Sequence, residues 1–479
     1  MNNTYETVIG LEIHAELSTK TKIFCSCKTD FGAPPNSQCC PVCMGMPGTL
    51  PTLNQKAVEY AVRAGLATNC EISLYSRFDR KNYFYPDLPK GYQITQYEFP
   101  ICKNGYLDID TDLGKKRIRI TRIHLEEDAG KLIHDSDCGT LVDCNRCGVP
   151  LIEIVTEPDI RSSGEAEAFL RTLRSVLMFA GVSDCRMNEG SFRCDINVSV
   201  RKIGDSTLGT RSEIKNLDSF SFVTKAIEYE HKRQTELIAS SGRVKRETRR
   251  FDESDGKTYS MRSKEEENDY RFFEEPDIPA LILREEDIER IKKELPMLPD
   301  ERMKLYLEEY RLTSDTAKVI LSDISLADFF EKAAKASKSP RTTANILVSD
   351  ILSYSNEGGF SSKIQASQLA VLSDLFFTEQ INSSTQKKLV KRMWEEGIDP
   401  ILTVREDDLL QINDADILSA IVDEVILENP KCVEDIRRGK TAATKTVIGK
   451  AMAKSQGKAN PRIINEIVAS KFKNEVKTK

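Results

Sequence analysis

Three separated segments of this 479-residue chain gather carboxylates, and two of them add an imidazole, a combination that binds hard divalent cations. Glu12 and His14 stand two apart, so in a strand both side chains point to the same face. The other two segments are residues 124–128 and the pair of acidic stretches at 188–190 and 195–197. Oxygen ligands with one imidazole suit Mg²⁺ or Mn²⁺ better than zinc. Each segment taken alone is more typical of a solvated strand edge than of a metal site.

A second group of candidate ligands is sulfur. Cys25 and Cys27 form one close pair, Cys40 and Cys43 form another, and 12 residues separate the pairs. Two such pairs can wrap one tetrahedral Zn²⁺ through four thiolates at about 2.3 Å, and a closed site of this kind has a structural role. Cys39 stands beside Cys40, and the sequence leaves open which of the two binds the metal. The alternative for the whole group is buried free thiols.

Further thiols occur among the 13 cysteines of the chain. Cys144 and Cys147 form a CxxC pair with Cys138 nearby, but no second pair completes a set of four ligands. Such thiols are more typical of ordinary buried cysteines, so we assign no metal to them. The N-terminus has no basic segment followed by an apolar one, so we expect a cytoplasmic protein with reduced thiols rather than disulfides.

The segment 78–87 interleaves charges with four aromatic side chains. Its Arg80 and Lys81 could hold phosphate while neighbouring rings stack on a base or a ribose. A hydrophobic loop with a charged rim would have the same composition. The chain contains no GxxxxGK[ST], GxGxxG or GxSxG motif. Sequence motifs therefore indicate neither a P-loop ATPase, nor a Rossmann enzyme, nor a serine hydrolase.

These candidate residues need rigid elements to hold them, and the first part of the chain supplies strands. A β-branched run at residues 7–9 and period-two alternation at 117–123 and 195–200 predict half-buried strands. Apolar residues at helical spacing predict a helix from 164 to 180. We therefore expect an α+β fold that begins with a β-rich antiparallel cradle domain over residues 1–293.

Helical periodicity takes over after the proline-containing break at residues 295–300. Asp300 is predicted to cap the first of these helices. We expect a helical linker domain over residues 294–404 and a small all-α tail domain over residues 405–479.

Charge is distributed unevenly along the chain, whose net value is −6. Residues 431–479 carry a surplus of nine positive charges, so the remainder carries −15. Apolar stripes at 417–426 and 463–472 can pack together and leave the basic side chains outside, namely those of Arg437, Arg438, Lys440, Lys445, Lys450, Lys454, Lys458 and Arg462. A basic tail on an acidic body suits a polyanionic partner, and the alternative is a solvated helical face. No apolar run approaches the roughly 20 residues that span a bilayer, so we expect no membrane partner.

Seven long motifs, in this order, resemble the B subunits of tRNA-dependent amidotransferases. They are ETVIGLEIH (6–14), DRKNYFYPD (79–87), RIHLEEDAGK (122–131), LIEIVTEPD (151–159), ETRRFD (247–252), DYRFFEEPD (269–277) and GKANP (457–461). The resemblance covers the whole chain. It implies the cradle, linker and tail domains and a heterotrimer with an amidase-type A subunit and a small C subunit.

The resemblance also implies a reaction. ATP would phosphorylate the side-chain carboxylate of misacylated Glu-tRNA(Gln), with Asp-tRNA(Asn) as a second candidate substrate, and ammonia from glutamine, delivered by the A subunit, would displace the phosphate. By resemblance, Mg²⁺ is held by Glu12, His14, Glu126 and Glu127, with Asp195 as an additional partner. Lys81 resembles a residue at the exit of the ammonia channel, and Arg80 or Lys81 would meet phosphate. The tail would contact the tRNA body.

The sequence departs from the family pattern at Cys39, Cys138, Cys144 and Cys147, which leaves the local thiol chemistry open. Two other functions remain alternatives. One is an amide synthetase that makes its own ammonia, although no Cys/His or Ser/Lys signature of a glutaminase stands out. The other is a tRNA-binding factor without catalysis, against which the acidic and imidazole clusters argue. Glutamine hydrolysis by the isolated chain and ATP hydrolysis stimulated by misacylated tRNA would distinguish the three.

Overall fold

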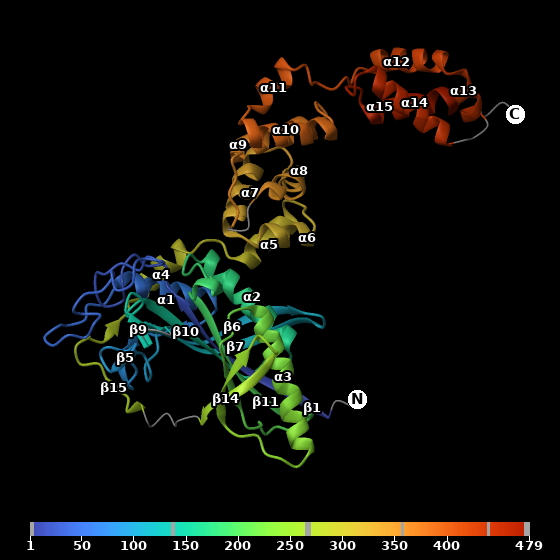
Figure 1. Cartoon of the computed structure of the whole chain (residues 1–479). Coiled ribbons are helices and arrows are strands. Elements are labelled where there is room, and N and C mark those ends of the chain that lie inside the picture. Colours follow the sequence, from blue (N-terminus) through green and yellow to red (C-terminus); the bar gives the residue numbers. More distant parts are fainter. Residues whose placement is uncertain (1–3, 136–138, 264–269, 356–358, 438–440, 474–479) are drawn as a thin grey trace. The chain divides into compact units, whose positions relative to one another are not determined.

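The computed structural model describes residues 4–135, 139–263, 270–355, 359–437 and 441–473 (Figure 1). The chain divides into two compact units, Met1–Pro299 and Asp300–Lys479. The first contains all the strands within the described residues, and the second is helical. The expected α+β fold is therefore confirmed.

A nine-stranded sheet forms the body of the first unit, in the order β14-β13-β12-β11-β1-β10-β7-β6-β2 within the described residues. Its strands are β1 (Tyr5–Glu16), β2 (Glu71–Ile72), β6 (Cys102–Thr111), β7 (Gly114–Glu127), β10 (Pro150–Thr156), β11 (Phe192–Lys202), β12 (Ser212–Lys215), β13 (Glu247–Asp252) and β14 (Lys257–Ser263). The strands predicted at residues 7–9, 117–123 and 195–200 lie within β1, β7 and β11.

One neighbouring pair in this sheet departs from the antiparallel arrangement that we expected. β12 and β13 run parallel, whereas the other neighbours pair antiparallel. Parallel neighbours cannot be joined by a tight hairpin and need a long crossover. The helix α3 (Phe220–Ala239) provides it, since it lies between these two strands in the sequence.

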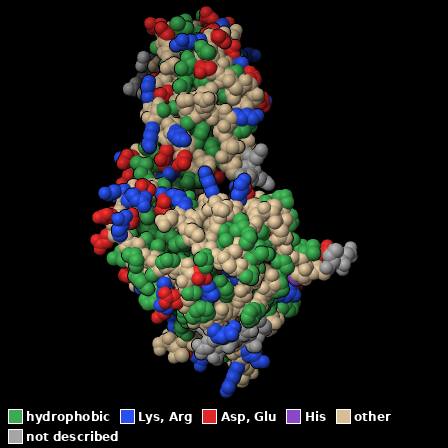
Figure 2. Space-filling view, turned by 90° about the vertical axis from the view of Figure 1, so that its left-hand side faces the viewer, with side chains coloured by type: hydrophobic (Ala, Val, Ile, Leu, Met, Phe, Trp, Pro, Cys, Tyr) green, Lys and Arg blue, Asp and Glu red, His purple; other side chains and the backbone are tan. Residues whose placement is uncertain are grey.

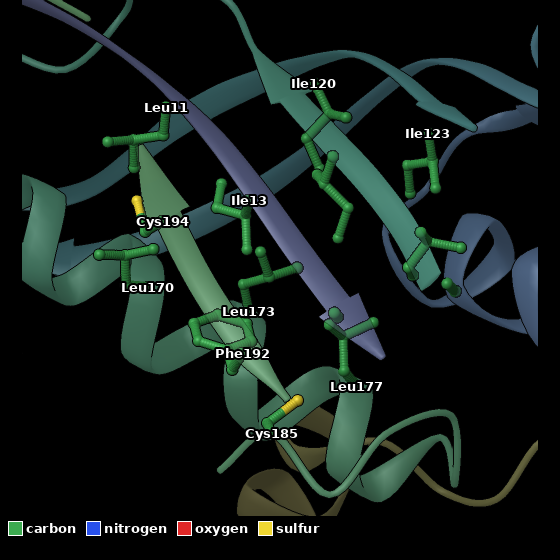
Figure 3. Close-up of a cluster of buried hydrophobic side chains, with 14 of the residues drawn as sticks. Leu11, Ile13, Ile120, Ile123, Leu170, Leu173, Leu177, Cys185, Phe192 and Cys194 are labelled. Atoms are coloured by element: carbon green, nitrogen blue, oxygen red, sulfur yellow. The ribbon is translucent and has the colours of Figure 1, made fainter. Parts of the chain in front are cut away.

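Helices cover the apolar face of the sheet. These are α1 (Gln55–Ala67), α2 (Ser163–Phe179) and α3, with the short η1 (Met187–Glu189) before β11. Ser162 caps α2 by accepting a hydrogen bond from the Glu165 N–H, and the helix lies one residue before the predicted span of 164–180. Figure 3 shows Leu170, Leu173 and Leu177 of α2 lying against side chains of β1, β7 and β11. The opposite face of the sheet is consequently left to polar residues.

Shorter strands stand beside the main sheet. β4 (Asp79–Asn82) pairs with β5 (Tyr92–Thr95) and with β15 (Phe273–Glu274). β3 (Tyr75–Ser76) pairs with β16 (Leu281–Ile282), and β8 (Lys131–Asp135) pairs with β9 (Gly139–Asp143). The side chain of Gln96, next to β5, accepts hydrogen bonds from the backbone of Leu125 (3.0 Å) and Ile101 (3.3 Å), which fastens this strand to β7.

The remaining elements are helical. They are α4 (Glu285–Glu294), α5 (Pro299–Glu308), α6 (Ser314–Ile320), α7 (Ile324–Ala336), α8 (Pro340–Ile346), the π-helix η3 (Leu347–Ile351), the 3₁₀ helix η4 (Leu352–Tyr354), α9 (Ala366–Phe377), α10 (Ser383–Glu396), α11 (Pro400–Glu406), α12 (Ala415–Glu428), α13 (Pro430–Arg437), α14 (Thr441–Lys454) and α15 (Pro461–Lys473). The predicted cap at Asp300 is wrong by position, because α5 already begins at Pro299. Proline suits the first turn of a helix, where its missing N–H has no intrahelical partner.

The last four helices share one core, to which the two predicted apolar stripes contribute Leu418, Val422, Ile464 and Val468. Ile417, also predicted to belong to the first stripe, is 52% exposed, because the turn that buries Leu418 directs its neighbour outward. Within the described residues no helix is both long and apolar enough to cross a membrane. On the face drawn in Figure 2, basic and acidic side chains are intermingled.

Candidate functional site

The candidate site occupies the polar face of the nine-stranded sheet. Strand alternation puts Leu11 and Ile13 into the core, so Glu12 and His14 of β1 face the other way. In β10 the core takes Ile152 and Ile154, and Glu153 between them faces the site. Cross-strand pairing then aligns His124 of β7 with Glu153, and Glu153 with His14. Three strands thus deliver three ligand-type side chains to one row.

A β-bulge in β7 is needed for this alignment. Ile118 and Ile120 are core residues, yet so are Ile123 and Leu125, so the alternation shifts by one residue between the two pairs. The shift coincides with the irregular register of β7 against β10 next to Thr156. Bulges of this kind re-aim side chains beside functional sites. Here the bulge turns Arg122, His124 and Glu126 to the polar face.

The ligand-type atoms converge closely. His14 Nε2 lies 3.3 Å from Glu153 Oε2, 3.5 Å from Glu126 Oε1 and 4.0 Å from Glu12 Oε1. His124 Nε2 lies 3.7 Å from a carboxylate oxygen of Glu126 and 3.7 Å from Glu153 Oε2. We call Glu12, His14, His124, Glu126 and Glu153 the carboxylate–imidazole cluster.

Burial and the closeness of the charged groups shift the pKa values within the cluster. Burial and the nearby Glu153 raise the pKa of Glu12 to about 7. Burial alone would lower the pKa of His14, but its hydrogen bond to Glu153 and the charges of Glu153, Glu126 and Glu12 raise it to about 9. Without another cation, the carboxylates therefore keep His14 protonated at neutral pH. A divalent cation would take over that role.

The donor set fits such an ion. Ligand atoms of Glu12, His14 and Glu153 lie within 4.8 Å of one another, and so do those of His124, Glu126 and Glu153. Carboxylate oxygens with imidazole suit Mg²⁺ or Mn²⁺. His124 Nδ1 is buried without a hydrogen-bond partner among the described residues, so the imidazole is not yet fully satisfied. The cluster opens into a cavity lined by Glu12, Lys81, Thr95, Gln96, Tyr97, Arg122, His124, Glu126, Glu153, Glu213, Lys215, Thr248, Tyr270 and Phe272.

The sulfur ligands lie in a loop on the same unit. The sulfur atoms of Cys25, Cys27, Cys40 and Cys43 lie within 4.8 Å of one another, and a tetrahedral ion with bonds of about 2.3 Å would need about 3.8 Å. A hydrogen bond from the Cys25 thiol, the backbone N–H of Cys40 and the nearby Lys22 ammonium lower the pKa of Cys43 to about 4. The group therefore forms a possible zinc site that already favours a thiolate.

The structure favours Cys40 over Cys39 as the fourth ligand. Cys40 belongs to the converging group, whereas the Cys39 thiol lies 3.9 Å from the side-chain oxygen of Asn145. Cys144 and Cys147 are buried behind this loop, where the buried Lys22 ammonium reaches Cys43 Sγ (3.5 Å) and the carbonyl of Cys144 (3.2 Å). Cys138 lies outside the described residues.

Known proteins match this chain along almost its whole length. The family described as "GatB/GatE catalytic domain" matches residues 7–289, and the "GatB domain" matches residues 328–472. A relative from Caldicellulosiruptor saccharolyticus, named as the B subunit of aspartyl/glutamyl-tRNA(Asn/Gln) amidotransferase, is 52% identical over 471 residues, which are 97% of this chain and 98% of the relative. The chain belongs to this family of amidotransferase B subunits. A relative of the same name from Carboxydothermus hydrogenoformans is 49% identical, over 98% of this chain and 99% of its own length.

The resemblance of the seven motifs to the amidotransferase B subunits is therefore confirmed, while the roles of individual residues stay predictions. Glu12, His14 and Glu126 meet in the cluster. Glu127 lies elsewhere, because it follows Glu126 on the strand and faces away. Its carboxylate pairs with Lys90, 2.5 Å from Nζ to Oε2, and accepts a hydrogen bond from the backbone of Ile94.

The other three residues that were predicted for the site differ in the partners that their side chains already have. Lys81 enters the cavity with its ammonium 4.9 Å from the centre of the Tyr270 ring. Asp195 pairs with Lys215, 2.5 Å from Oδ2 to Nζ. Arg80 is engaged instead by Glu275, through hydrogen bonds of 2.7 and 2.8 Å, and by Asp277 at 3.0 Å.

Sequence reasoning missed Glu153, and it named His124 without assigning it a role. A signal for Glu153 was present, since it is the single acidic residue in the otherwise apolar or neutral run PLIEIVT of β10. A charged residue inside a buried strand needs a partner, which marks it as a candidate ligand.

In the tail, the predicted basic residues are only partly free. Lys445 and Lys450 are exposed, although the Lys450 ammonium also donates a hydrogen bond to the side-chain oxygen of Asn429. Lys454 pairs with Glu424 (2.8 Å) and Glu428 (2.6 Å), Lys458 with Asp408 (2.6 Å) and Arg462 with Glu379 (3.3 Å). Arg438 and Lys440 lie outside the described residues, as does the side chain of Arg437.

Proposed function

We propose that this chain is the catalytic B subunit of a tRNA-dependent amidotransferase, a ligase that forms a carbon–nitrogen bond. In this reaction ATP phosphorylates the side-chain carboxylate of misacylated Glu-tRNA(Gln), or of Asp-tRNA(Asn), and ammonia then displaces the phosphate. Membership of the family of amidotransferase B subunits supports the proposal, and one observation carries it. The carboxylate–imidazole cluster is a buried to half-buried set of oxygen and imidazole donors beside a cavity.

The chemistry requires activation, because hydroxide is a poor leaving group and a carboxylate does not react with ammonia. Glu12, His14, Glu126 and Glu153 would hold Mg²⁺, with His124 beside them, and Glu127 and Asp195 stay further candidates. When bound, Mg²⁺ would gather phosphate oxygens and neutralise their charge. The buried carboxylates would fix the position of that charge, and the cavity walls would keep water from competing with ammonia.

Lys81 also lines the cavity, and its ammonium lies near the rings of Tyr83 (5.7 Å) and Tyr270 (4.9 Å). Burial would raise the pKa of Glu153, but His124, His14 and, least of the three, Lys81 lower it. We propose that Lys81 orients the activated carboxylate toward the point where ammonia arrives. Arg80 would have to leave Glu275 and Asp277 before it could meet phosphate.

The remaining parts would serve assembly. Zn²⁺ held by Cys25, Cys27, Cys40 and Cys43 would fix the loop as a closed structural site. An amidase-type A subunit would release ammonia from glutamine, and a small C subunit would complete the heterotrimer. We propose a catalytic domain over residues 1–293, a helical linker over 294–404 and a tail over 405–479 that contacts the tRNA body.

The test uses the complex assembled with its partner subunits, MgATP, glutamine and each misacylated tRNA. Glu12→Ala or His14→Ala should abolish amide formation, while tRNA binding and tRNA-independent glutamine hydrolysis persist. Glu6→Ala, on the same strand but paired with Arg201 outside the cavity, is the matched control. Near-normal amide formation by either cluster variant would overturn the assignment. Glutamine hydrolysis by the isolated chain would instead favour a self-sufficient synthetase, and absence of tRNA-stimulated ATP hydrolysis would favour a binding factor.

A further inference from the structure

The cavity is lined by cations as well as by the carboxylate–imidazole cluster. Arg122, Lys215 and Lys81 all enter it. Arg122 and Lys215 stand near opposite ends of one cross-strand row. In that row Arg122 pairs with Val155, Val155 with Glu12, and Glu12 with Asp195, which Lys215 reaches from β12. The predicted phosphate ligands included neither Arg122 nor Lys215.

Arg122 is half-buried and has no anionic partner among the described residues. Its Nε atom is buried without a hydrogen-bond partner, and none of the ion pairs between described residues involves its side chain. Two arginines earlier on β7 behave otherwise: Arg117 pairs with Asp108 (2.9 Å) and Arg119 with Asp159 (2.7 Å). Leaving a charged donor unpaired in a buried position is costly, so such a group indicates an absent anionic ligand.

Lys215 retains donor capacity. Its ammonium contacts Asp195 at 2.5 Å and stands 3.9 Å from Glu213. An ammonium group has three N–H donors, so a bound ligand can accept from those that Asp195 leaves. Thr248 donates to Glu213 (2.8 Å) and thereby holds the strand that carries Lys215 against β13.

Spacing between the two cations suits an extended anion. From β7 to β12 the row crosses four strand intervals of about 4.8 Å, so the two Cα atoms are about 19 Å apart. Both side chains are long and reach into the cavity from the ends of the row.

We propose that Arg122 and Lys215 bind the polyphosphate of a nucleoside triphosphate and position its terminal phosphoryl group beside Glu12. This inference rests on the proposed function and deepens it. The guanidinium can hold two phosphate oxygens at once, whereas the ammonium acts as a point charge. Arg80 is unsuited to this role while Glu275 and Asp277 neutralise it.

The test compares Arg122→Met and Lys215→Met with Arg122→Lys and Lys215→Arg in the full complex. Phosphate release and amide formation are measured against MgATP at saturating misacylated tRNA, and then against tRNA at saturating MgATP. Each Met variant should lose roughly 10- to 100-fold in kcat/KM for ATP, as expected for one charged hydrogen-bonding group. The KM for tRNA should stay unchanged, and Lys215→Arg should recover part of the loss. Inorganic phosphate should inhibit the Met variants more weakly than the wild type.

Arg117→Met is the matched control, because Arg117 lies on the same strand and pairs with Asp108 outside the cavity. An unchanged dependence on ATP in both Met variants would overturn the inference. A rise in the KM for tRNA alone would also overturn it, because the two cations would then contact tRNA phosphates. If a Met variant fails to fold, judged by melting temperature, the Gln variant at the same position, which also removes the charge, decides: an unchanged KM for ATP there overturns the inference. Failure of the proposed function would look different, because the wild type itself would then show no tRNA-dependent ATP consumption.

Discussion

The two ligand clusters of the first unit are assembled in different ways. The four cysteines come from one loop, residues 25–43, and converge without any help from strand pairing. The carboxylate–imidazole cluster draws Glu12 from β1, Glu126 from β7 and Glu153 from β10. Both sites border a cavity, which Cys25 and Cys43 line at the loop site. Four thiols would nevertheless complete the coordination of a tetrahedral ion there, whereas the strand site would leave positions open.

This difference suggests that the cysteine cluster serves the stability of the fold and that the carboxylate–imidazole cluster serves the chemistry. A closed set of four ligands leaves no coordination position for a substrate, so its metal holds the loop in place. An open set of carboxylates beside a cavity concentrates negative charge, which a bound cation would neutralise. That cation could then attract a phosphate group. Substitutions in the two clusters should therefore change different measurements.

Among the substitutions that compare the two clusters, the largest effect is expected at Glu153. Glu153→Gln removes a carboxylate that lies 3.3 Å from His14 and 3.7 Å from His124, while keeping the shape of the side chain. We expect amide formation to fall by roughly 10²–10³-fold, because loss of one preorganised electrostatic group has about that effect. Zinc content should be unchanged. The comparison would break if the variant lost zinc as readily as activity.

Cys43→Ser should give the reverse pattern. The variant should lose zinc and on the order of 3 kcal/mol of unfolding free energy, because metal binding contributes directly to folding. Turnover per folded molecule should be nearly retained. Elemental analysis and thermal unfolding under reducing conditions test the prediction. Zinc-free wild-type protein with four freely titratable thiols would contradict it.

Substitutions in the tail change neither of the two clusters. Lys445→Ala combined with Lys450→Ala removes two exposed charges of the tail, and deletion of residues 405–479 removes them all. We expect the KM for tRNA to rise a few-fold for the double variant and more for the deletion, with a weaker dependence on salt. Amide formation at high tRNA concentration and low salt should persist in part. An unchanged KM and salt slope would mean that the tail is a solvated face.

The smallest effect is expected at Cys39. Cys39→Ser should retain zinc and change the unfolding free energy by less than about 0.5 kcal/mol, since its thiol contacts Asn145 rather than the other sulfurs. Cys40→Ser, one residue away, should behave like Cys43→Ser. Zinc loss from the Cys39 variant alone would reverse our choice of the fourth ligand.

Local patterns predicted the elements and the loop site well. The helix expected at 164–180 lies within one residue of α2, and the cysteine spacing led directly to the converging sulfurs. Both depend on residues close together in the sequence. The period-two pattern also placed Glu12 and His14 on one face, because a strand has only two faces.

Features that depend on partners far apart in the sequence were harder to predict. Glu127 was expected with Glu126, but adjacent residues of a strand face opposite sides. Glu153 was not expected, because its neighbours in space come from β1 and β7. Arg80 looked free in the sequence, yet Glu275, far along the chain, engages it. The parallel β12–β13 pair likewise depends on a crossover that local patterning does not reveal.

The central position of β1 has a consequence for synthesis on the ribosome. This strand emerges before its two neighbours, β10 and β11, which end only at Thr156 and Lys202. At about 5–20 residues per second, its apolar residues wait roughly 10–40 s for both edges to be paired. A nascent chain that exposes such a strand is prone to aggregate, so we expect chaperones to bind the N-terminal segment until β11 has left the exit tunnel.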